Sequence, residues 1–239
     1  MDKKTLVTTL VGLVLFVGFL ALMNKVHHPP QTKEQELEGL ISFFNSPQYH
    51  DGFVHKEHPW GDDLDSLRTR SRAARDLGEM GEDAKDAVPA LIHALQNEPS
   101  EGVRGSMVFA LGDIGKSTKN TKNITFALIQ SLQNDPHEDV RCSAASSLSW
   151  MEEDAKDVVP ALIQVLENDQ DGEVRDLAVD SLGNMGKNAK DAVPALIQVL
   201  ENDPYPAVRA NAAGALKAVG TPEALKALKG YRVERWKSK

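Results

Sequence analysis

The sequence predicts an all-α protein, a solenoid of about five stacked helix pairs preceded by a single N-terminal transmembrane helix. Three observations predict this fold class: a unit of about 34 residues that recurs from residue 64 onward, a helical spacing of apolar residues inside each unit, and an uncharged stretch over residues 5–23. Of the 239 residues, 41% are apolar and 26% are charged. These are ordinary globular values, and they argue against a disordered chain.

The charge is unevenly distributed along the chain. The formal net charge is −8, but residues 1–30 carry +2 and residues 217–239 carry +5, so residues 31–216 carry −15. A chain this acidic is not expected to bind nucleic acid. It has one cysteine, Cys142, which excludes an intramolecular disulfide framework and a multi-cysteine zinc site.

Residues 1–26 are expected to form a membrane anchor. The 19 residues of the stretch 5–23 would form a helix about 30 Å long, which matches the hydrocarbon core of a bilayer. Lys3 and Lys4 precede this stretch and only Lys25 follows it closely, which favours a body on the non-cytoplasmic side. The alternative is a cleaved signal peptide and a secreted protein, although a small-residue cleavage pattern is missing. We therefore expect a single-pass membrane protein.

Residues 27–63 are interpreted as a linker that contains one short helix. Within it, four apolar residues follow the i, i+3, i+4, i+7 spacing of an amphipathic helix that could cap the array, namely Leu37, Leu40, Ile41 and Phe44. Three histidines then stand close to carboxylates: His50, His55 and His58. Histidine and carboxylate together can bind a metal ion, so a metal site stays an alternative to a solvated loop.

The repeats occupy residues 64–230 and are marked by a recurring arginine. The arginines are separated by 34, 37, 34 and 34 residues: Arg70, Arg104, Arg141, Arg175 and Arg209. A leucine follows each arginine by seven positions, and a glycine stands four positions later except in the third unit, which has Glu152. A second motif, VPALIQVL or a close variant, follows. In the second unit Phe126 replaces its proline, and three extra residues lengthen the preceding loop.

Each unit is expected to contain two helices. The glycine suits a left-handed cap at the end of the first helix. An aspartate is expected to cap the start of the second helix, with proline in its first turn: Asp86, Asp157 and Asp191. One helix pair cannot bury its apolar face alone, so neighbouring pairs must stack. A closing half-unit ends the array, and residues 231–239 are expected to form a basic tail.

These units resemble the HEAT-repeat family, in particular its short bacterial form, which is similar to phycobilisome-lyase-type repeats. The signature VRxxAAxxL stands here as VRCSAASSL (140–148), VRDLAVDSL (174–182) and VRANAAGAL (208–216), followed by VPALIQVL. The resemblance covers residues 64–229 and implies an α-solenoid, but the family has many unrelated functions.

The resemblance also implies a ladder in which an acidic residue six positions before each arginine joins it along the stack. The matching pairs are Glu98/Arg104, Asp135/Arg141, Asp169/Arg175 and Asp203/Arg209. An anion-binding stripe of arginines is the alternative.

The resemblance includes two alternative functions, an iron oxygenase of the deoxyhypusine hydroxylase type and a phycobilin-lyase-like chromophore chaperone. The oxygenase uses several His-Glu pairs, whereas this chain has only His137-Glu138, and nothing in it marks a bilin pocket. No nucleophile and base can be paired in the sequence. Cys142 is expected to be a buried, inert thiol. We predict no catalytic residue, no metal ligand and no cofactor.

Positions that break the repeat pattern are the candidate protein-binding residues. Trp150 stands nine positions after its arginine, and Phe109 stands five positions after its own, where the other units have smaller or polar residues. A large aromatic side chain at such a position is typical of an interface, and local repacking is the alternative. On the second helix, His93 replaces a glutamine that recurs in the other units. It is either a further partner-binding residue or a neutral sequence change. We predict a membrane-tethered, non-catalytic scaffold or adaptor that binds another protein.

Overall fold

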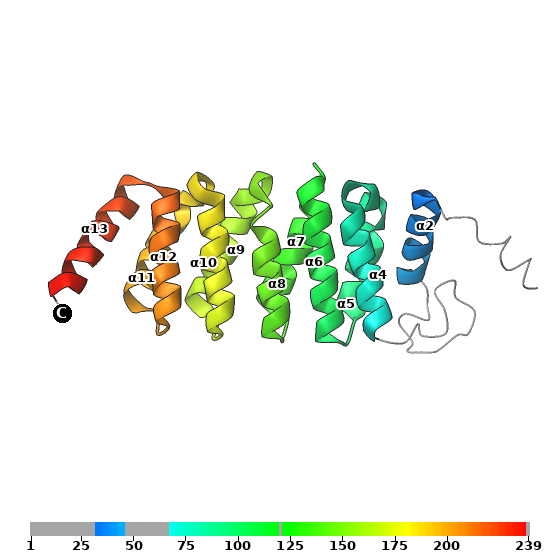
Figure 1. Ribbon diagram of the computed structural model, residues 1–239, viewed down its shortest axis with the longest axis horizontal. Helices are drawn as coiled ribbons and strands as arrows, with labels where there is room; N and C mark the ends of the chain where they lie inside the picture. The colour runs from blue at the N-terminus through cyan, green and yellow to red at the C-terminus, as the bar shows by residue number, and fades with distance from the viewer. Residues whose placement is uncertain (1–31, 46–66, 120, 238–239) are drawn as a thin grey trace, which may run out of the picture. The chain divides into compact units, whose positions relative to one another are not determined.

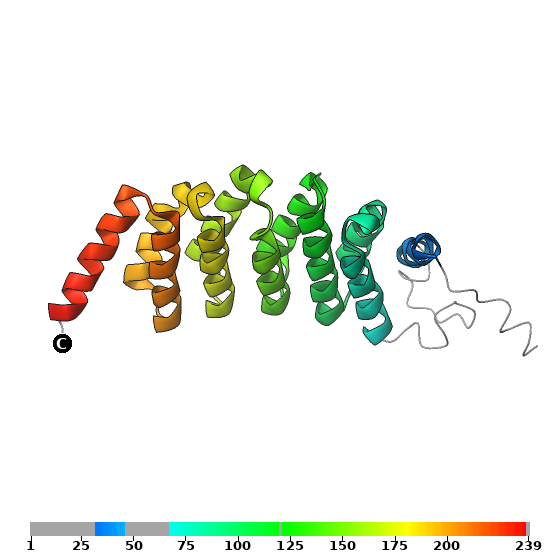
Figure 2. The same ribbon diagram turned by 45° about the horizontal axis from the view of Figure 1, so that its top comes forward.

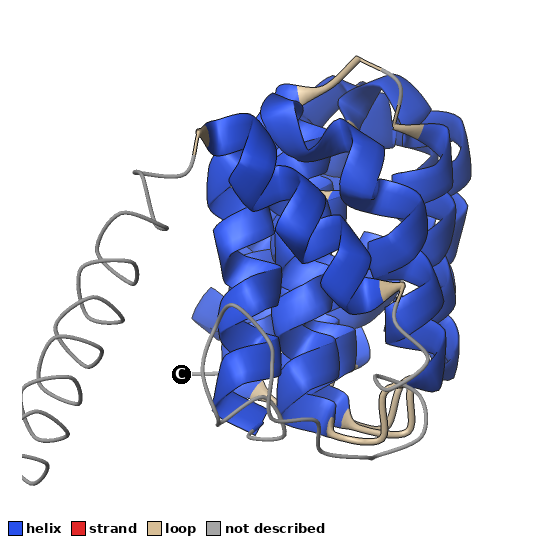
Figure 3. Cartoon of the chain, turned by 90° about the vertical axis from the view of Figure 1, so that its right-hand side faces the viewer, coloured by secondary structure: helices blue, strands red, loops and turns tan. Residues whose placement is uncertain are grey.

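The structure, a computed structural model, describes residues 32–45, 67–119 and 121–237. The chain divides into two units, Met1–Gly39 and Leu40–Lys239. All elements in the described ranges are helical, and the loops between them are short (Figure 3).

The described part of the first unit is the beginning of helix α2 (Lys33–Phe44). Thr32 and Gln35 cap this helix reciprocally. The Gln35 N–H donates to Thr32 Oγ1 at 3.3 Å, and the Thr32 N–H donates to Gln35 Oε1 at 3.1 Å. The last turns of α2 belong to the second unit, where Leu40 and Phe44 of the predicted amphipathic stripe are buried.

The rest of the second unit is an array of helix pairs in two rows (Figure 1). The first row contains α4 (Leu67–Met80), α6 (Glu101–Ser117), α8 (Glu138–Leu148), α10 (Gly172–Met185) and α12 (Pro206–Val219). The second row contains α5 (Val88–Asn97), α7 (Lys122–Asn134), α9 (Ala155–Asn168), α11 (Val193–Asn202) and α13 (Pro222–Lys237). We number the pairs as repeats one to five, from α4–α5 to α12–α13.

Each helix packs against the next helix of its own row, and the second helix of each of repeats one to four also packs against the first helix of the following repeat. Figure 2 shows the same succession of helices from a second direction. The leucine that follows each repeat arginine by seven positions is fully buried in all five repeats: Leu77, Leu111, Leu148, Leu182 and Leu216. Burial of one such side chain stabilises the fold by about 1.5–3 kcal/mol. The all-α repeat array predicted from the sequence therefore agrees with the structure.

Three of the four repeat glycines form the turn after the first helix as predicted. Gly81, Gly186 and Gly220 have positive φ angles of 55°, 52° and 70°, as expected for glycine after a helix. Gly115 does not, because α6 continues past it to Ser117. The turn after α8 has Glu152 at this position and does not use a positive φ angle.

The prediction of aspartate caps on the second helices is wrong. Two short 3-10 helices, η1 (Gly81–Ala87) and η3 (Gly186–Ala192), precede α5 and α11. The N-cap residues are therefore alanines, Ala87 and Ala192, without a side-chain hydrogen bond. In repeat three the helix α9 already begins at Ala155, so Asp157 lies in its first turn.

Repeat three has a different turn, η2 (Glu152–Asp154), which depends on repeat two. Asp154 is buried, and one of its carboxylate oxygens accepts hydrogen bonds from the hydroxyls of Thr121 at 2.6 Å and Thr125 at 2.7 Å. Thr121 lies in the lengthened loop of repeat two and Thr125 in α7. The irregular turn of repeat three therefore depends on repeat two, because the lengthened loop and α7 each supply one of the two donors that the buried carboxylate requires.

The predicted transmembrane helix and single-pass membrane location are corrected here. No helix in the described ranges is long and apolar enough to cross a membrane. The longest of them, α6, has 17 residues, and its exposed side carries Glu101, Asp113 and Lys116. The stretch 5–23, on which the prediction and its signal-peptide alternative rest, lies outside the described residues. The fold class is an all-α helical solenoid.

Candidate functional site

An arginine–carboxylate ladder joins the first helix of each repeat to the loop that leads into the next repeat. In each rung the two nitrogens Nε and Nη2 of one arginine donate to the two oxygens of one carboxylate, a bidentate geometry that strengthens the pair. Arg141 donates to Asp169 at 2.7 and 3.1 Å. The other rungs, with distances between 2.7 and 3.2 Å, are Arg70–Glu98, Arg104–Asp135 and Arg175–Asp203.

The ladder pairs each arginine with the acid of the following repeat, not with the acid six positions before it. The earlier residue contributes its backbone instead: Nη1 of Arg141 donates to the carbonyl oxygens of Asp135 at 3.1 Å and Pro136 at 3.3 Å. Arg104, Arg175 and Arg209 make the same pair of backbone contacts. Arginines engaged in this way hold the repeats together, and the geometry does not favour the anion-binding alternative.

The electrostatics of the ladder match this role. The hydrogen bond from Arg175 to Asp203 raises the pKa of the arginine, although burial opposes the shift. Burial would raise the pKa of the Asp203 carboxyl, but hydrogen bonds from Arg175 and the Tyr205 N–H outweigh it and hold this pKa below its ordinary value. Both groups are therefore charged at neutral pH.

Tyr205 covers the last rung of the ladder. It is the N-cap residue of α12, and its ring centroid lies 5.6 Å from Cζ of Arg175. Its ring also fits against Gly172, where an added methyl would lie 2.9 Å from ring carbons. The sequence analysis did not single out Tyr205. Its signal was a break in the repeat pattern, because the other N-cap residues at this position are Ser100, His137 and Asp171.

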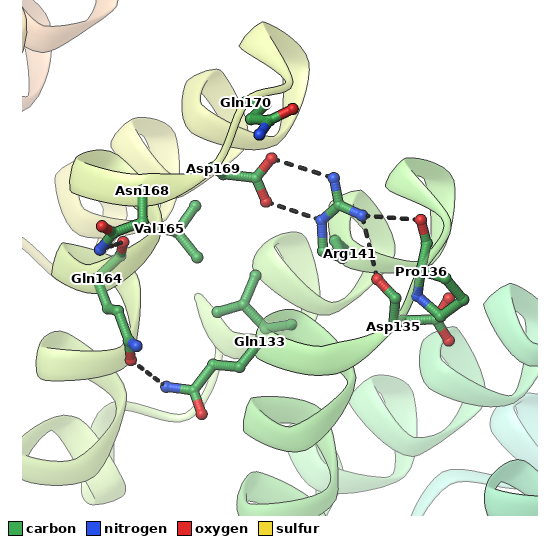
Figure 4. Close-up of a pocket in the computed structure, with 10 residues that line it drawn as sticks. Gln133, Asp135, Pro136, Arg141, Gln164, Val165, Asn168, Asp169 and Gln170 are labelled. Atoms are coloured by element: carbon green, nitrogen blue, oxygen red, sulfur yellow. Dashed lines mark hydrogen bonds and ion pairs between the residues drawn. The ribbon is translucent and has the colours of Figure 1, made fainter.

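Three grooves run between consecutive helices of the second row, on the surface that we call the second-helix face (the exposed sides of α5, α7, α9 and α11). The groove between α5 and α7 has a volume of about 390 Å³, and the groove between α7 and α9 about 400 Å³. The groove between α9 and α11 has about 810 Å³. Each reaches the ladder at one end, as Figure 4 shows for Arg141 and Asp169 in the middle groove.

The groove walls carry amide side chains at the same positions of successive repeats. One row consists of Gln130, Gln164 and Gln198, and another of Asn134, Asn168 and Asn202. In the middle groove, Nε2 of Gln133 donates to Oε1 of Gln164 at 2.7 Å, a bond across the two helices that Figure 4 shows. His93 occupies the glutamine position on α5 and is exposed, and its carbonyl oxygen accepts from the Asn97 amide at 2.8 Å.

The candidate residues Phe109 and Trp150 lie on the first-helix face (the exposed sides of α4, α6, α8, α10 and α12 together with the turns directly after these helices). Their side chains are 55% and 56% exposed. Nζ of Lys116, from the helix that carries Phe109, lies 4.1 Å from the centroid of the Trp150 ring. Phe109 lies on α6 and Trp150 lies in the turn directly after α8, and these two helices pack against each other. Phe126, on the second-helix face, is 65% exposed and was noted in the sequence only as a replaced proline.

Cys142 and His137, two side chains considered for chemistry in the sequence, make structural contacts in the described part of the chain. Burial raises the pKa of the Cys142 thiol to about 12, with further contributions from Glu173 and Asp171, so the thiol is protonated and half-buried. His137 is the N-cap residue of α8 and accepts from the Asp139 N–H at 3.4 Å. No group of three or more potential metal-binding side chains is found in the described ranges. His50, His55 and His58 lie outside them.

Comparison with known proteins identifies a matching family and a similar solved structure. The family model of HEAT repeats matches residues 63–149, 89–175 and 159–236. The fold is similar to a chain in the structure of the complex of CpcE and CpcF of phycocyanin lyase from Nostoc sp. PCC7120. That match has a TM-score of 0.53 and 19% sequence identity, and it covers 75% of this chain and 96% of the other. At this identity the likeness concerns the fold alone.

No curated protein matches the chain. The family assignment rests on the repeats themselves, which match the model over more than half of the sequence and stack through a shared ladder. The chain belongs to the HEAT-repeat family.

Proposed function

We propose that this protein is a non-catalytic scaffold or adaptor that binds another protein through the first-helix face of repeats two and three. The observation that carries the proposal is the exposure of Phe109 and Trp150. At the corresponding positions of repeat four the chain has Asp180 and Asn184, which are exposed and polar. Exposed aromatic residues are enriched among the side chains that dominate the binding energy of a protein interface.

Lys116 adds to this surface. Its ammonium group over the Trp150 ring is a cation–π contact, which is worth about 0.5–1 kcal/mol at an exposed site. Such a contact restricts the ring before a partner arrives, so less conformational entropy is lost on binding. The ring edge and the Phe109 side chain stay available to a partner.

A protein partner is also consistent with the fold. HEAT repeats form extended surfaces that suit protein interaction, and the similar solved structure is itself a complex of two proteins of phycocyanin lyase. That structure supports a chromophore chaperone as the alternative function. We place it second because a flat conjugated ligand requires an apolar pocket. The α7–α9 and α9–α11 grooves carry amides and ion pairs, and the more apolar α5–α7 groove also ends at ladder residues.

The test is affinity capture of the full-length protein from extracts of its source cells after chemical cross-linking. The variant F109S/W150N replaces both aromatic residues by those that stand at the same positions in repeats three and four. The matched control D180S/N184A changes these positions in repeat four.

We expect one stoichiometric protein in the wild-type and control captures and at least a tenfold loss in the variant. Equal capture by all three proteins, or capture of no protein, would contradict the proposal. An absorption band from a co-purified pigment would favour the chromophore chaperone instead. Circular dichroism of each variant establishes that it is folded.

A further inference from the structure

We propose that the second-helix face binds an extended basic polypeptide segment, which places an apolar side chain in the α5–α7 groove and a cationic side chain in the α9–α11 groove. This inference goes beyond the proposed function, because it concerns the other row of helices. It uses neither Phe109 nor Trp150, so either proposal can fail alone.

The amide rows suit the backbone of an extended peptide. Each Asn or Gln side chain offers an acceptor oxygen and two N–H donors, whereas an extended backbone presents an N–H and a C=O at every residue. Asn168 is held in place because Nδ2 donates to the carbonyl oxygen of Gln164 at 2.9 Å. Asn134 makes the corresponding bond to Gln130 at 3.2 Å. Amides fixed at the same position of successive repeats can pair with a backbone irrespective of its side chains.

The charge of the grooves favours a cationic segment. The ladder carboxylates are each paired with an arginine, so their charges are compensated. Among the described residues that line the three grooves, Glu167 is the charged residue outside the ladder, and it makes no ion pair within the described chain. Glu201 stands one repeat further along at the same position and is exposed, whereas Gln96 and Gln133 stand there in repeats one and two. The negative charge therefore lies at the α9–α11 end.

The α9–α11 groove combines this carboxylate with an aromatic ring. Tyr205 is 54% exposed and lines the groove together with Glu167 and Gln198. A carboxylate and an aromatic face in one groove are the groups that bind the ammonium of lysine or the guanidinium of arginine. The volume of about 810 Å³, twice that of either other groove, leaves space for such a side chain.

The α5–α7 groove is apolar in comparison. Ile92 and Leu95 line it from α5, and Phe126 lines it from α7 with 65% of its surface exposed. The middle groove is bridged by the Gln133–Gln164 hydrogen bond, so a bound backbone would cross it over amides (Figure 4). The three grooves thus distinguish the two ends of a bound segment.

The spacing of the repeats sets the length of the segment. Packed helices lie about 8–10 Å apart, so the two outer grooves are separated by about 20 Å. An extended chain advances about 3.3 Å per residue, so about six residues separate the apolar side chain from the cationic one.

The probe is a fluorescein-labelled 12-residue peptide with one leucine, two arginines about six residues away, and serine, threonine or alanine elsewhere. It is made in both sequence directions, with matched peptides in which glutamates replace the arginines. Fluorescence anisotropy measures binding to the full-length protein at about 0.1 M salt. We expect saturable binding of the arginine peptide in one direction and no binding of the glutamate peptides.

The variants locate the contact. E167Q is expected to weaken the arginine peptide about fivefold to tenfold, and F126A is expected to weaken it to a similar degree. The matched control D180N removes one carboxylate from the first-helix face and is expected to bind as the wild type does. E167K is expected to reverse the preference, so that it loses the arginine peptide and binds the glutamate peptide.

Equal binding of arginine and glutamate peptides, wild-type binding by E167Q, or an equal loss in D180N and E167Q would overturn this inference. Absence of binding by any of the peptides would overturn it as well. Wild-type binding of the arginine peptide by F109S/W150N is expected, because these substitutions lie on the first-helix face.

Discussion

Repeat four is regular, whereas repeats two and three depart from the repeat pattern in their turn, loop length and exposed residues. The features that all three share are those that hold the array together, and the others are particular to this chain. Repeat four keeps the 34-residue period, a glycine turn with positive φ at Gly186, and polar residues on its first-helix face. Repeats two and three contain the insertion, the Glu152 turn and three of the large exposed aromatic residues, namely Phe109, Phe126 and Trp150. Both regions keep the same ladder.

The comparison teaches that the stacking of these repeats does not depend on the glycine turn. The carboxylate of Asp154 and the hydroxyls of Thr121 and Thr125 stabilise the irregular turn instead. The ladder is compatible with either turn, because its arginines lie near the start of the first helices and its carboxylates lie in the loops before those helices, at the end away from the turn. Surface positions in repeats two and three could therefore change without loss of the fold.

The largest effect is expected from the removal of a ladder arginine. R175A leaves Asp203 buried without its partner, which should lower the free energy of unfolding by about 3–5 kcal/mol. R104A should cost less, because the side chains of Arg104 and Asp135 are 13% and 8% exposed, against 8% and 3% for Arg175 and Asp203. Urea unfolding measures both. R72A, at a side chain 77% exposed, is the control and should stay within about 0.5 kcal/mol of wild type.

A smaller effect is expected from D154A, which leaves two buried hydroxyls without their acceptor. We expect a loss of about 1–3 kcal/mol by urea unfolding. E153A, at an exposed neighbour in the same turn, is the matched control. Equal stability of D154A and E153A would mean that the irregular turn does not depend on the buried carboxylate.

The same carboxylate predicts the acid sensitivity of the irregular region. Burial would raise the pKa of Asp154, but the hydrogen bonds from Thr121 and Thr125 outweigh it, so its pKa lies below the ordinary value of 3.8. Its stabilisation is therefore fully present above about pH 4 and is lost as the pH falls through the lower folded value. D154N should show a shallower loss of stability between pH 5 and 2 than wild type, because its side chain does not titrate. Parallel curves for both proteins would contradict this prediction.

The turns themselves should respond differently to alanine. G186A forces a residue with a Cβ atom into a positive φ angle of 52° and should cost about 1–2 kcal/mol, although the nearest atom would lie 3.8 Å away. E152A, at the corresponding position of repeat three, should change the stability by less than about 0.5 kcal/mol, because no positive φ is required there. Equal effects on the thermal midpoint would mean that the two turns are equivalent.

The smallest effect is expected at Cys142. C142A should change the stability by less than about 1 kcal/mol and should leave partner capture unchanged. With a pKa of about 12 the thiol has little thiolate at pH 8, so alkylation by iodoacetamide should be about a hundredfold slower in the folded protein than in urea. Rapid alkylation of the folded protein would identify Cys142 as reactive.

The repeats could be predicted from the sequence, but the pairing in the ladder could not be resolved by the period alone. In a chain with a 34-residue period, an acid six positions before one arginine is also 28 positions after the preceding one. Arg141 and Asp169 are separated by 28 residues and form the pair that the structure shows. Only the packing of one loop on the next decides between the two assignments.

The surface was less predictable than the core. The exposure of Phe109 and Trp150 followed from comparison of the repeats, because a solvent-facing position is polar in the other copies. The burial of Asp154 could not be predicted, because one partner, Thr121, lies in a lengthened loop and the other, Thr125, stands where repeats one and three have valine. Tyr205 and Glu167 are 38 positions apart in the sequence, and only the structure shows that both line the α9–α11 groove.

The central claim, that the first-helix face of repeats two and three contacts another protein, is tested most directly by site-specific photo-cross-linking in source cells. A photoreactive residue is placed in turn at positions 109, 150, 180 and 184 of the full-length protein. Our account predicts cross-links to the same protein from positions 109 and 150 and none from positions 180 and 184. Cross-links of equal yield from all four positions, or from 180 and 184 alone, would contradict it.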